Sequence, residues 1–216
     1  MGGERRDLVR MAQRDGGLWA PLSRAWFYDF FLRILGERRA RATVVRDYVK
    51  ASPGTRLLDL GCGTGRTLDF THPDVEYVGI DVSAPYIQAA RARYGERGRF
   101  ILAPVQEAPL RDLGRFETAY AGALLHHLDD AACIRLLEAV NMLLVPRGRF
   151  VSFDCVYTKG QNRVARLLID HDRGRHVRTV EGYTALARTV FADVGATVRE
   201  DLLRVPYSHL MMECQR

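Results

Sequence analysis

The feature of this sequence that most constrains its fold is an apolar segment that runs directly into three closely spaced glycines. Residues 57–65 read Leu-Leu-Asp-Leu-Gly-Cys-Gly-Thr-Gly. Glycine lacks a Cβ atom and readily adopts positive φ, so the backbone here can turn sharply and lie against a ligand. The pattern predicts a buried strand, a ligand-binding loop and a following helix, although an ordinary strand-to-helix turn capped by an Asp also fits it.

After residue 55, short apolar runs alternate with helical patterns. Strands are expected at Arg56–Leu60, Tyr77–Asp81, Phe100–Ala103, Thr118–Ala121 and Phe150–Asp154. Helices are expected near 65–70, 84–95 and 129–144, the first being brief because only seven residues separate Gly65 from Pro73. Such alternation predicts an α/β fold with a doubly wound, mostly parallel sheet and ligands at the carboxyl ends of its strands.

The pattern changes in the last third of the chain. Two helical stretches, at about 161–170 and 181–192, precede two extended runs, Thr197–Val205 and Tyr207–Cys214, which only Pro206 separates. A connection this short requires antiparallel pairing, because a parallel return needs a dozen or more residues. We therefore expect an antiparallel final strand pair.

Composition narrows the class of partner. The net charge of the 216 residues is +6, but residues 1–50 carry 11 basic and 6 acidic side chains and the rest of the chain carries 21 and 20. The nearly neutral body argues against nucleic acid as a partner. No apolar run reaches the length of a membrane-spanning helix, and Met1–Arg14 has no apolar signal-peptide region, so we expect a cytoplasmic protein without a membrane partner.

The four cysteines lie far apart and show no Cys-x-x-Cys spacing; they are Cys62, Cys133, Cys155 and Cys214. A chain of this length needs no disulfide framework, so reduced thiols and no metal site are expected. Nothing in the sequence indicates an oligomeric state.

Two carboxylates accompany the glycine loop. Asp59 precedes it, and Asp81 ends the next predicted strand 20 residues after Gly61, where a carboxylate can accept hydrogen bonds from both hydroxyls of a ribose. The dinucleotide fingerprint G-x-G-x-x-G does not match, because the spacing here is G-x-G-x-G and position 66 is Arg. A cofactor with a ribose but without a pyrophosphate is therefore expected, and a dehydrogenase is disfavoured.

From about Arg56 to Asp154 the sequence resembles the class I S-adenosylmethionine-dependent methyltransferases of the small-molecule type. The motifs that carry the resemblance are Leu58–Gly65, Tyr77–Ser83, Ala123–Leu128 and Leu143–Phe150. The resemblance implies a Rossmann-like, seven-stranded sheet with an antiparallel final pair, and S-adenosyl-L-methionine as cofactor.

The resemblance also implies roles for individual residues. Asp59 would orient the loop and the amino-acid end of the cofactor, the backbone of residues 61–65 would approach it, and Asp81 would hold the ribose. Many family members contact adenine through an Asp where this chain has Pro104, so the Val105 backbone or the Gln106 side chain is expected to take that part. The expected cofactor-binding residues are Asp59, Gly61, Cys62, Gly63, Gly65, Asp81, Val82, Val105, Gln106, Ala121 and Tyr28.

Methyl transfer from a sulfonium is an in-line displacement whose leaving group needs no proton, so alignment alone supplies much of the catalysis. The catalytic candidates are His126 and His127, after the fourth strand, and Asp154, at the end of the fifth. Either imidazole suits a general base near neutral pH. Both equally suit hydrogen-bonded roles, capping the next helix or lining the cofactor pocket.

The segment His171–Arg178 gathers three arginines and two histidines around a glycine. Arginine forks bind carboxylates and phosphates, so an anionic acceptor is one hypothesis; a solvated basic turn is the other. The candidate substrate-binding residues are Tyr157, His171, Arg173, Arg175 and Arg178.

We expect a single domain over residues 1–216, with an N-terminal helical lid over 1–50 and a cofactor-binding core over 51–216. The core carries a substrate-side insertion at about 155–180. The aromatic stripe at residues 26–31 suits such a lid, although a buried helix face produces the same spacing. A methyltransferase acting on a small molecule is the favoured function; the alternatives are a non-catalytic S-adenosylmethionine-binding protein and an RNA or protein methyltransferase.

Overall fold

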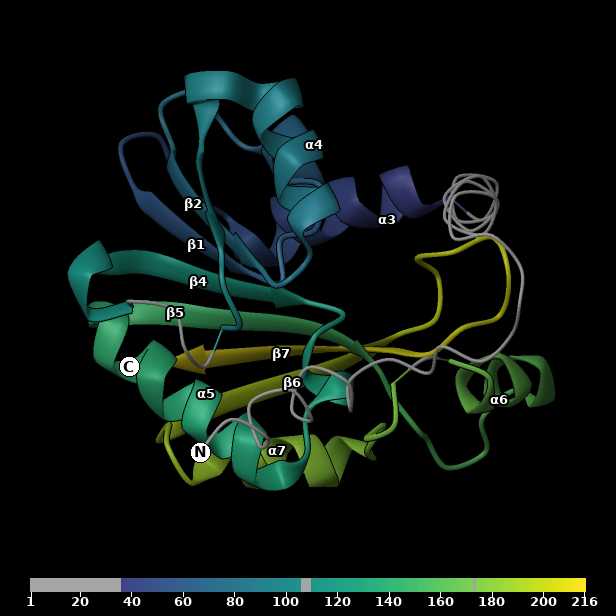
Figure 1. The fold of residues 1–216 in the computed structure, drawn as a ribbon. Coiled ribbons are helices and arrows are strands. Elements are labelled where there is room, and N and C mark those ends of the chain that lie inside the picture. The colour runs from purple at the N-terminus through teal and green to yellow at the C-terminus, as the bar shows by residue number, and fades with distance from the viewer. Residues whose placement is uncertain (1–35, 106–109, 173) are drawn as a thin grey trace, which may run out of the picture.

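The computed structural model describes residues 36–105, 110–172 and 174–216. Their centre is a seven-stranded sheet in the order β3-β2-β1-β4-β5-β7-β6 (Figure 1). The strands are β1 Arg56–Leu60, β2 Glu76–Asp81, β3 Arg99–Leu102, β4 Phe116–Gly122, β5 Leu144–Cys155, β6 Asp193–Arg199 and β7 His209–Gln215. Strands β1 to β5 pair in parallel, and β7 runs antiparallel to both β5 and β6. The expected mostly parallel sheet with an antiparallel final pair is confirmed.

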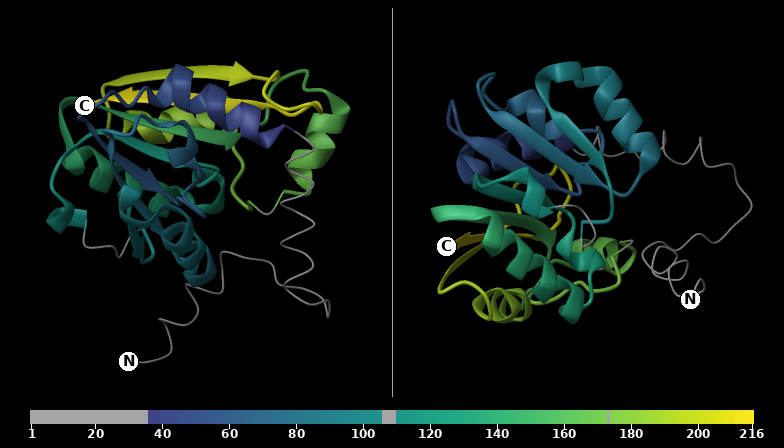
Figure 2. Two further views of the ribbon diagram at one scale, coloured as in Figure 1. Left: turned by 90° about the horizontal axis from the view of Figure 1, so that it is seen from above. Right: turned by 60° about the vertical axis from the view of Figure 1, so that its left-hand side comes forward.

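Helices cover both faces of this sheet (Figures 1 and 2). The α-helices are α3 Glu37–Val44, α4 Ala84–Tyr94, α5 Asp130–Leu143, α6 Arg163–Asp170 and α7 Val180–Arg188. The described residues also form five shorter helical turns, η1 Val45–Val49, η2 Arg66–Phe70, η3 Gly95–Arg97, η4 Leu110–Leu113 and η5 Leu125–His127. The expected brief helix after the glycine loop is η2, a single 3₁₀ segment.

The central strands are buried on both sides. Successive side chains of a strand point to opposite faces, so neighbouring residues enter different cores. On β1, Leu58 and Leu60 pack into a core that α5 and α7 complete. Leu57, one position before Leu58 and so on the opposite face, packs into a second core with residues of α3 and α4. Near-continuous apolar runs are typical of parallel strands covered by helices on both faces. The two cores hold the strands, and hence their carboxyl ends, in a fixed arrangement.

Helix α3 and the π-helical turn η1 cover part of the sheet directly. Ala40, Val44 and Val49 are buried in the same core as Leu57. Residues 37–49, which fall within the expected N-terminal helical lid, are helical and belong to the helical layer of the sheet. The remainder of the expected lid, with Tyr28, lies outside the described residues.

The last two strands differ in position from the expectation. Strand β6 is Asp193–Arg199, not Thr197–Val205, and residues 200–208 form a long connection to β7. Leu202, in this connection, packs into the core beneath α3 and is 4% exposed. Since β6 is an edge strand whose side chains are mostly exposed, its sequence carries no apolar alternation to mark it.

Two other elements have different bounds. Strand β5 starts at Leu144 rather than Phe150, and Arg147, between Pro146 and Gly148, lies inside it at φ +65°. Helix α7 ends at Arg188, while the expected stretch extended to 192. Within the described part of the chain, no helix combines the length and apolar character needed to cross a membrane.

Gly65 tests how tightly the glycine loop is built into this fold. A Cβ atom at Gly65, where φ is +74°, would lie 2.8 Å from Cε1 of Phe100, whereas one at Gly54, at φ +76°, meets nothing within 4 Å. We predict that Gly65→Ala lowers the free energy of unfolding by about 2 to 4 kcal/mol, through overpacking added to left-handed strain. Gly54→Ala should cost about 1 to 2 kcal/mol, from strain alone. Urea unfolding measures both, and equal losses would contradict the packing argument.

Candidate active site

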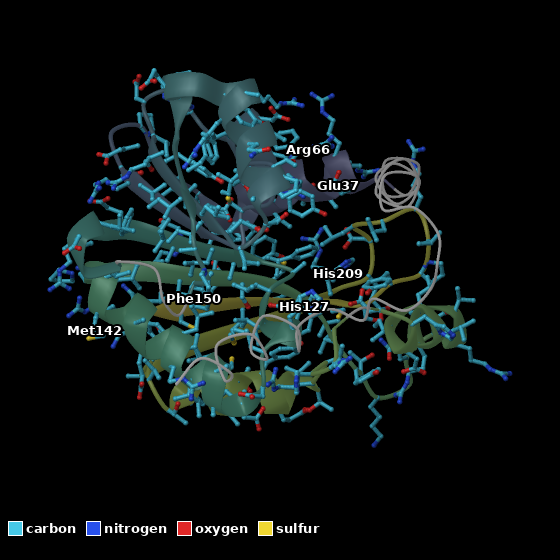
Figure 3. All side chains as sticks on the ribbon, in the orientation of Figure 1. Glu37, Arg66, His127, Met142, Phe150 and His209 are labelled. Carbon is cyan, nitrogen blue, oxygen red and sulfur yellow. The ribbon has the colours of Figure 1, made fainter. Side chains whose placement is uncertain are left out.

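The carboxyl ends of the parallel strands bring the candidate residues to one edge of the sheet. The glycine loop follows β1, Asp81 ends β2, and Ala123 follows β4. Asp154 lies near the end of β5. In Figure 3 the labelled Arg66, Glu37, His127 and His209 lie toward this edge, while Met142 and Phe150 lie toward the opposite one.

Backbone hydrogen bonds fasten the glycine loop to the end of β2. The amides of Gly61 and Cys62 both donate to the carbonyl of Ile80, at 2.8 and 3.0 Å. The next glycine amide, of Gly63, donates to Oδ2 of Asp81 at 2.8 Å. Oδ1 of Asp81 accepts from the amide of Ser83, also at 2.8 Å. Two amides therefore aim this carboxylate, and each of its oxygens can accept a further hydrogen bond.

The three glycines of the loop differ in what surrounds them. A Cβ atom at Gly61 would lie 3.3 Å from the Leu124 side chain, and one at Gly65 would meet Phe100. At Gly63, where φ is +55°, a Cβ atom would meet none of the described residues within 4 Å. The middle of the loop thus presents bare backbone to open space beside Asp81, as a cradle for a ligand requires.

Asp59 lies beneath the loop rather than on its surface. Its side chain is 2% exposed and accepts a hydrogen bond from the Tyr77 hydroxyl at 2.6 Å. Burial raises the pKa of Asp59, while the Tyr77 hydrogen bond and the charge of Arg41 act in the opposite direction. The orienting role predicted for Asp59 stays a prediction.

The other predicted cofactor residues divide by exposure. Val82 is 55% exposed beside Asp81, so its side chain is available to a ligand. Val105 and Ala121 are buried in the core. The Cys62 side chain points into the second core, and burial raises the pKa of its thiol. Gln106 lies outside the described residues.

The segment after β4 is held in a strained backbone conformation. Ala123 has φ +54°, and its amide donates to the carbonyl of Phe153 on β5 at 2.6 Å. The left-handed conformation costs a residue with a Cβ atom about 1 to 2 kcal/mol and is frequent near functional sites. This turn directs the following η5, with His126 and His127, across the end of β5.

His126 is held between two carboxylates. The side chain is 4% exposed, and its Nδ1 lies 2.8 Å from Oδ1 of Asp154. Its Nε2 lies 3.3 Å from Oδ1 of Asp172, which follows α6. The ring of His127, half-buried, is centred 4.3 Å from the ring of His126.

The two carboxylates determine the charge of His126. Burial disfavours the imidazolium, but hydrogen bonds to Asp154 and Asp172 raise the pKa of His126 well above its usual range. Burial likewise opposes the charge of Asp172, yet His126 and the amide of Gly174 lower the pKa of Asp172 to about 2. The resulting ion pair favours the hydrogen-bonded role foreseen for His126 over that of a general base, which leaves His127 as the histidine candidate for a base.

Arg178 does not match the expected anion clamp. Its guanidinium donates to the carbonyls of Leu125 and Leu128, at 3.2 and 2.7 Å, and to Asp130 at 2.7 Å. A further bond reaches the carbonyl of His176. The hydrogen-bonding capacity of the fork is used within the protein, so Arg178 anchors the segment to η5 and α5 instead of binding a substrate.

The same segment packs closely on His126. The amide of His176 donates to the carbonyl of His126 at 3.0 Å. A Cβ atom at Gly174 would lie 2.8 Å from that carbonyl oxygen and would overlap the imidazole ring. Only glycine lets the segment approach this closely, which accounts for the glycine among the charged residues of 171–178.

The structure describes three of the other predicted substrate residues, which are Tyr157, His171 and Arg175. The Tyr157 hydroxyl donates to Asp170 on α6, and a ring nitrogen of His171 lies 2.8 Å from the carbonyl of Leu167. Arg175 is exposed. Arg173 lies outside the described residues.

Three residues near His126 had not been singled out as site residues. Cys155 follows Asp154, and Tyr207 donates to Oδ2 of Asp172 at 3.3 Å. His209 on β7, 5% exposed, stacks on Phe153 with ring centroids 4.6 Å apart. Cys155 pairs with His209 in the β5–β7 register, a contact across more than 50 residues that no local pattern indicates.

Comparison with known proteins finds similarity to methyltransferases. A family model described as a methyltransferase domain matches residues 58–150. An O-methyltransferase of Pyrenophora dematioidea is 35% identical over 124 residues, which are 54% of this chain and 45% of that protein. A probable tRNA methyltransferase 9B of Bos taurus is 30% identical over 111 residues, 50% of this chain and 23% of that protein. The chain thus spans less than half the length of these curated relatives.

Solved structures agree in fold. The pyocyanin biosynthetic protein PhzM superposes with a TM-score of 0.67 at 21% identity, covering 87% of this chain and 57% of that one. The plantazolicin methyltransferase BpumL, solved with a desmethyl plantazolicin analogue and S-adenosylhomocysteine, gives 0.66 at 16% identity, covering 91% of each chain. The fold of β1 to β7 is therefore shared with these two proteins.

Arg178 and Arg175 form a matched pair for testing the anchor. We predict that Arg178→Ala lowers the free energy of unfolding by about 2 to 4 kcal/mol, because it leaves backbone carbonyls near Leu125 without their donor. Arg175→Ala, at an exposed position, should change it by no more than about 0.5 kcal/mol. Urea unfolding of the two variants measures the difference. An Arg178→Ala variant as stable as the wild type would return Arg178 to the substrate-binding candidates.

His209 gives a pH dependence of stability with a definite sign. Burial lowers the pKa of His209 to about 4, an effect that the nearby Asp154 and Asp201 carboxylates oppose and the His126 charge assists. Between pH 6.5 and 4 the unfolded chain takes up a proton that the folded protein excludes, so stability falls as pH falls, by about 3 kcal/mol across the window. In His209→Gln this loss should largely disappear.

Unfolding by urea at several pH values between 4 and 7 measures this effect. His72→Gln, which removes a partly exposed imidazole, is the control and should follow the wild type. Parallel pH profiles for His209→Gln and the wild type would rule out a buried neutral His209.

Proposed function

We propose that this chain, a member of the class I S-adenosylmethionine-dependent methyltransferases, transfers the methyl group of S-adenosylmethionine to a small-molecule acceptor. The observation that carries the proposal is the bare backbone at Gly63 beside the oriented carboxylate of Asp81. These groups lie at the carboxyl edge of β1 and β2, where open α/β sheets bind ligands. The family match over residues 58–150 includes both.

The residues present fit the cofactor that the family uses. The Gly63 backbone has room for a close ligand, and Asp81 keeps acceptor capacity for ribose hydroxyls. Val82, exposed next to Asp81, offers an apolar contact for the adenine of the cofactor. When bound, S-adenosylmethionine supplies an activated methyl group on a sulfonium.

The chain's own contribution is alignment of the acceptor and removal of its proton. We assign the removal of this proton to His127, which lies half-buried beside the His126 ring. His126, fixed by Asp154 and Asp172, acts as a positioning residue that holds η5 at the end of β5. An acceptor with an ionisable hydroxyl suits such a base. An anionic acceptor stays a prediction that depends on Arg173 and Arg175.

A substrate screen distinguishes this function from its rivals. The purified chain is incubated with S-adenosylmethionine and panels of phenols, carboxylic acids and transfer RNA, and S-adenosylhomocysteine is measured. Release with a phenol or a carboxylic acid supports the proposal, and release with transfer RNA alone replaces it with an RNA methyltransferase. Calorimetric binding of the cofactor without release in any panel indicates a binding protein.

Asp81 gives the sharpest test of the cofactor site. We predict that Asp81→Asn weakens S-adenosylmethionine binding by about 10-fold to 100-fold, the worth of hydrogen bonds to a charged group, about 1.5 to 3 kcal/mol. The matched control is Asp69→Asn, which removes a carboxylate that pairs with Arg93 in the turn after the loop. Isothermal titration of both variants is the measurement. If the two variants bind equally well, Asp81 does not hold the ribose.

A further inference from the structure

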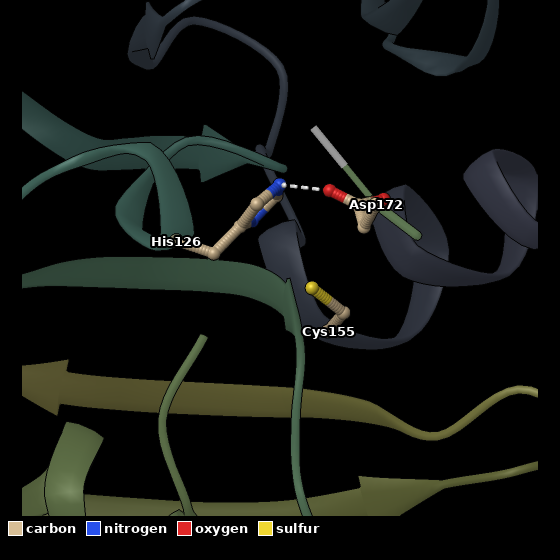
Figure 4. Close-up of side chains that lie close together, drawn as sticks. All are labelled: His126, Cys155 and Asp172. Atoms are coloured by element: carbon tan, nitrogen blue, oxygen red, sulfur yellow. Dashed lines mark ion pairs between the residues drawn. The ribbon is translucent and has the colours of Figure 1, made fainter. Parts of the chain in front are cut away.

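Three side chains from separate parts of the chain meet beside the end of β5. They are His126 of η5, Cys155 at the last position of β5, and Asp172 after α6 (Figure 4). Their ligating atoms, an imidazole nitrogen, Sγ and a carboxylate oxygen, all lie within 4.8 Å of one another. Among the described residues this is the group of histidine, cysteine and acidic side chains close enough to share one ion.

We propose that His126, Cys155 and Asp172 form a binding site for a divalent cation of the zinc class. Zn²⁺ is borderline-soft and takes imidazole nitrogen, thiolate sulfur and carboxylate oxygen as ligands. Mg²⁺ and Ca²⁺ prefer oxygen ligands alone, so a thiolate in the set selects against them. The mixed donor set therefore identifies the class of metal.

The spacing of the donors suits a tetrahedral ion. Bonds of about 2.0 to 2.1 Å from zinc to nitrogen and oxygen place the two ligand atoms about 3.3 Å apart at a tetrahedral angle. Nε2 of His126 and Oδ1 of Asp172 are 3.3 Å apart. The hydrogen bond on the other side of the same ring, to Asp154, is shorter, at 2.8 Å. The wider of the two distances, between His126 Nε2 and Asp172 Oδ1, therefore suits two atoms that bind the same ion.

The surroundings orient the ligands in the manner of known metal sites. Asp154 accepts from Nδ1 of His126, which fixes the ring so that Nε2 faces the other ligands. This carboxylate–histidine arrangement is the usual support of a metal-bound imidazole. The Asp172 carboxylate is itself held by the amide of Gly174 at 2.9 Å and by the Tyr207 hydroxyl at 3.3 Å. In the part of the chain that the structure describes, two buried polar atoms of this region, Asp154 Oδ2 and His209 Nδ1, have no hydrogen-bond partner.

The burial of the three residues indicates an ion that is enclosed on one side. His126 and Cys155 are each 4% exposed, whereas the side chain of Asp172 is 24% exposed. Three protein ligands leave one position of a tetrahedral ion for water or for an acceptor atom, as in catalytic zinc sites. Binding the ion releases the thiol proton of Cys155 and the Nε2 proton of His126 to solvent.

The role of such an ion in methyl transfer rests on the proposed function, but its binding does not. An acceptor hydroxyl or thiol at the fourth position would lose its proton more readily, because a bound metal ion lowers the pKa of its ligand. Metal binding is therefore measured without cofactor or acceptor, so that either proposal can fail while the other stands.

The experiment is a titration of the chelator-treated 216-residue protein with Co²⁺, a spectroscopic substitute for Zn²⁺. We expect saturation at one equivalent, with a thiolate-to-cobalt charge-transfer band and the intense visible bands of a tetrahedral site. Excess Zn²⁺ should displace Co²⁺ and remove both signals. Excess Mg²⁺ should leave them in place.

Matched variants assign the bands to the three residues. Cys155→Ser should abolish the charge-transfer band, whereas Cys214→Ser, which changes a thiol buried on β7, should retain it. Asp172→Asn should weaken Co²⁺ binding, and Asp154→Asn should weaken it by about 10-fold to 100-fold, as loss of a supporting carboxylate does. Circular dichroism verifies that each variant is folded.

Two results would overturn the proposal. One is the absence of a charge-transfer band in the folded wild-type protein at excess Co²⁺. The other is a band that survives in folded Cys155→Ser, which would place the metal elsewhere. Either result would leave His126 and Asp172 as an ion pair with a neighbouring thiol.

Discussion

Parallel strands whose carboxyl ends meet at one edge are the constraint on which the rest of this structure depends. Two cores, one on each face, keep β1, β2, β4 and β5 in register, and each strand delivers one chemical group to that edge. The glycine loop, Asp81 and Asp154 come from segments far apart in the sequence, and the pairing of the strands is enough to place them at the same edge. Strand order alone brings them together.

Within this frame, His126 links the sheet to the segment after α6. Its ring joins Asp154 of the sheet to Asp172 of the segment after α6, and its carbonyl accepts the amide of His176. Both carboxylates help keep the ring charged, and the charged ring lowers the pKa of Asp172. Charge and position are thus coupled: the pairs that fix the ring also determine its protonation.

The elements that the sequence predicted well are those whose signal is local. The glycine loop, the strand from Arg56 and the brief turn after Gly65 depend on neighbouring residues, and each was found where it was expected. Strand β6 was misplaced because edge strands need no apolar alternation, while Leu202, which had the apolar character, is buried in the core instead.

The site was foreseen only in part, for a similar reason. His126 and Asp154 stood out as polar residues after buried strands, whereas Cys155 and His209 meet only through the pairing of β5 with β7. Arg178 is of a residue type that often binds anionic ligands. Only its hydrogen bonds to the carbonyls of Leu125 and Leu128 reveal a structural role. Amino-acid type indicates what a side chain can bind, and the fold determines whether its donors remain available.

The Arg178 anchor has a consequence for selectivity. The guanidinium joins residues 176–178 to the end of η5 and to Asp130 at the start of α5, so this segment cannot move outward without breaking several hydrogen bonds at once. Under the proposed function, the segment forms a wall beside the acceptor. A wall fixed in this way has one shape before and after an acceptor arrives. Discrimination between acceptors at this wall then depends on complementarity to a preformed surface, and little binding energy is spent on ordering it.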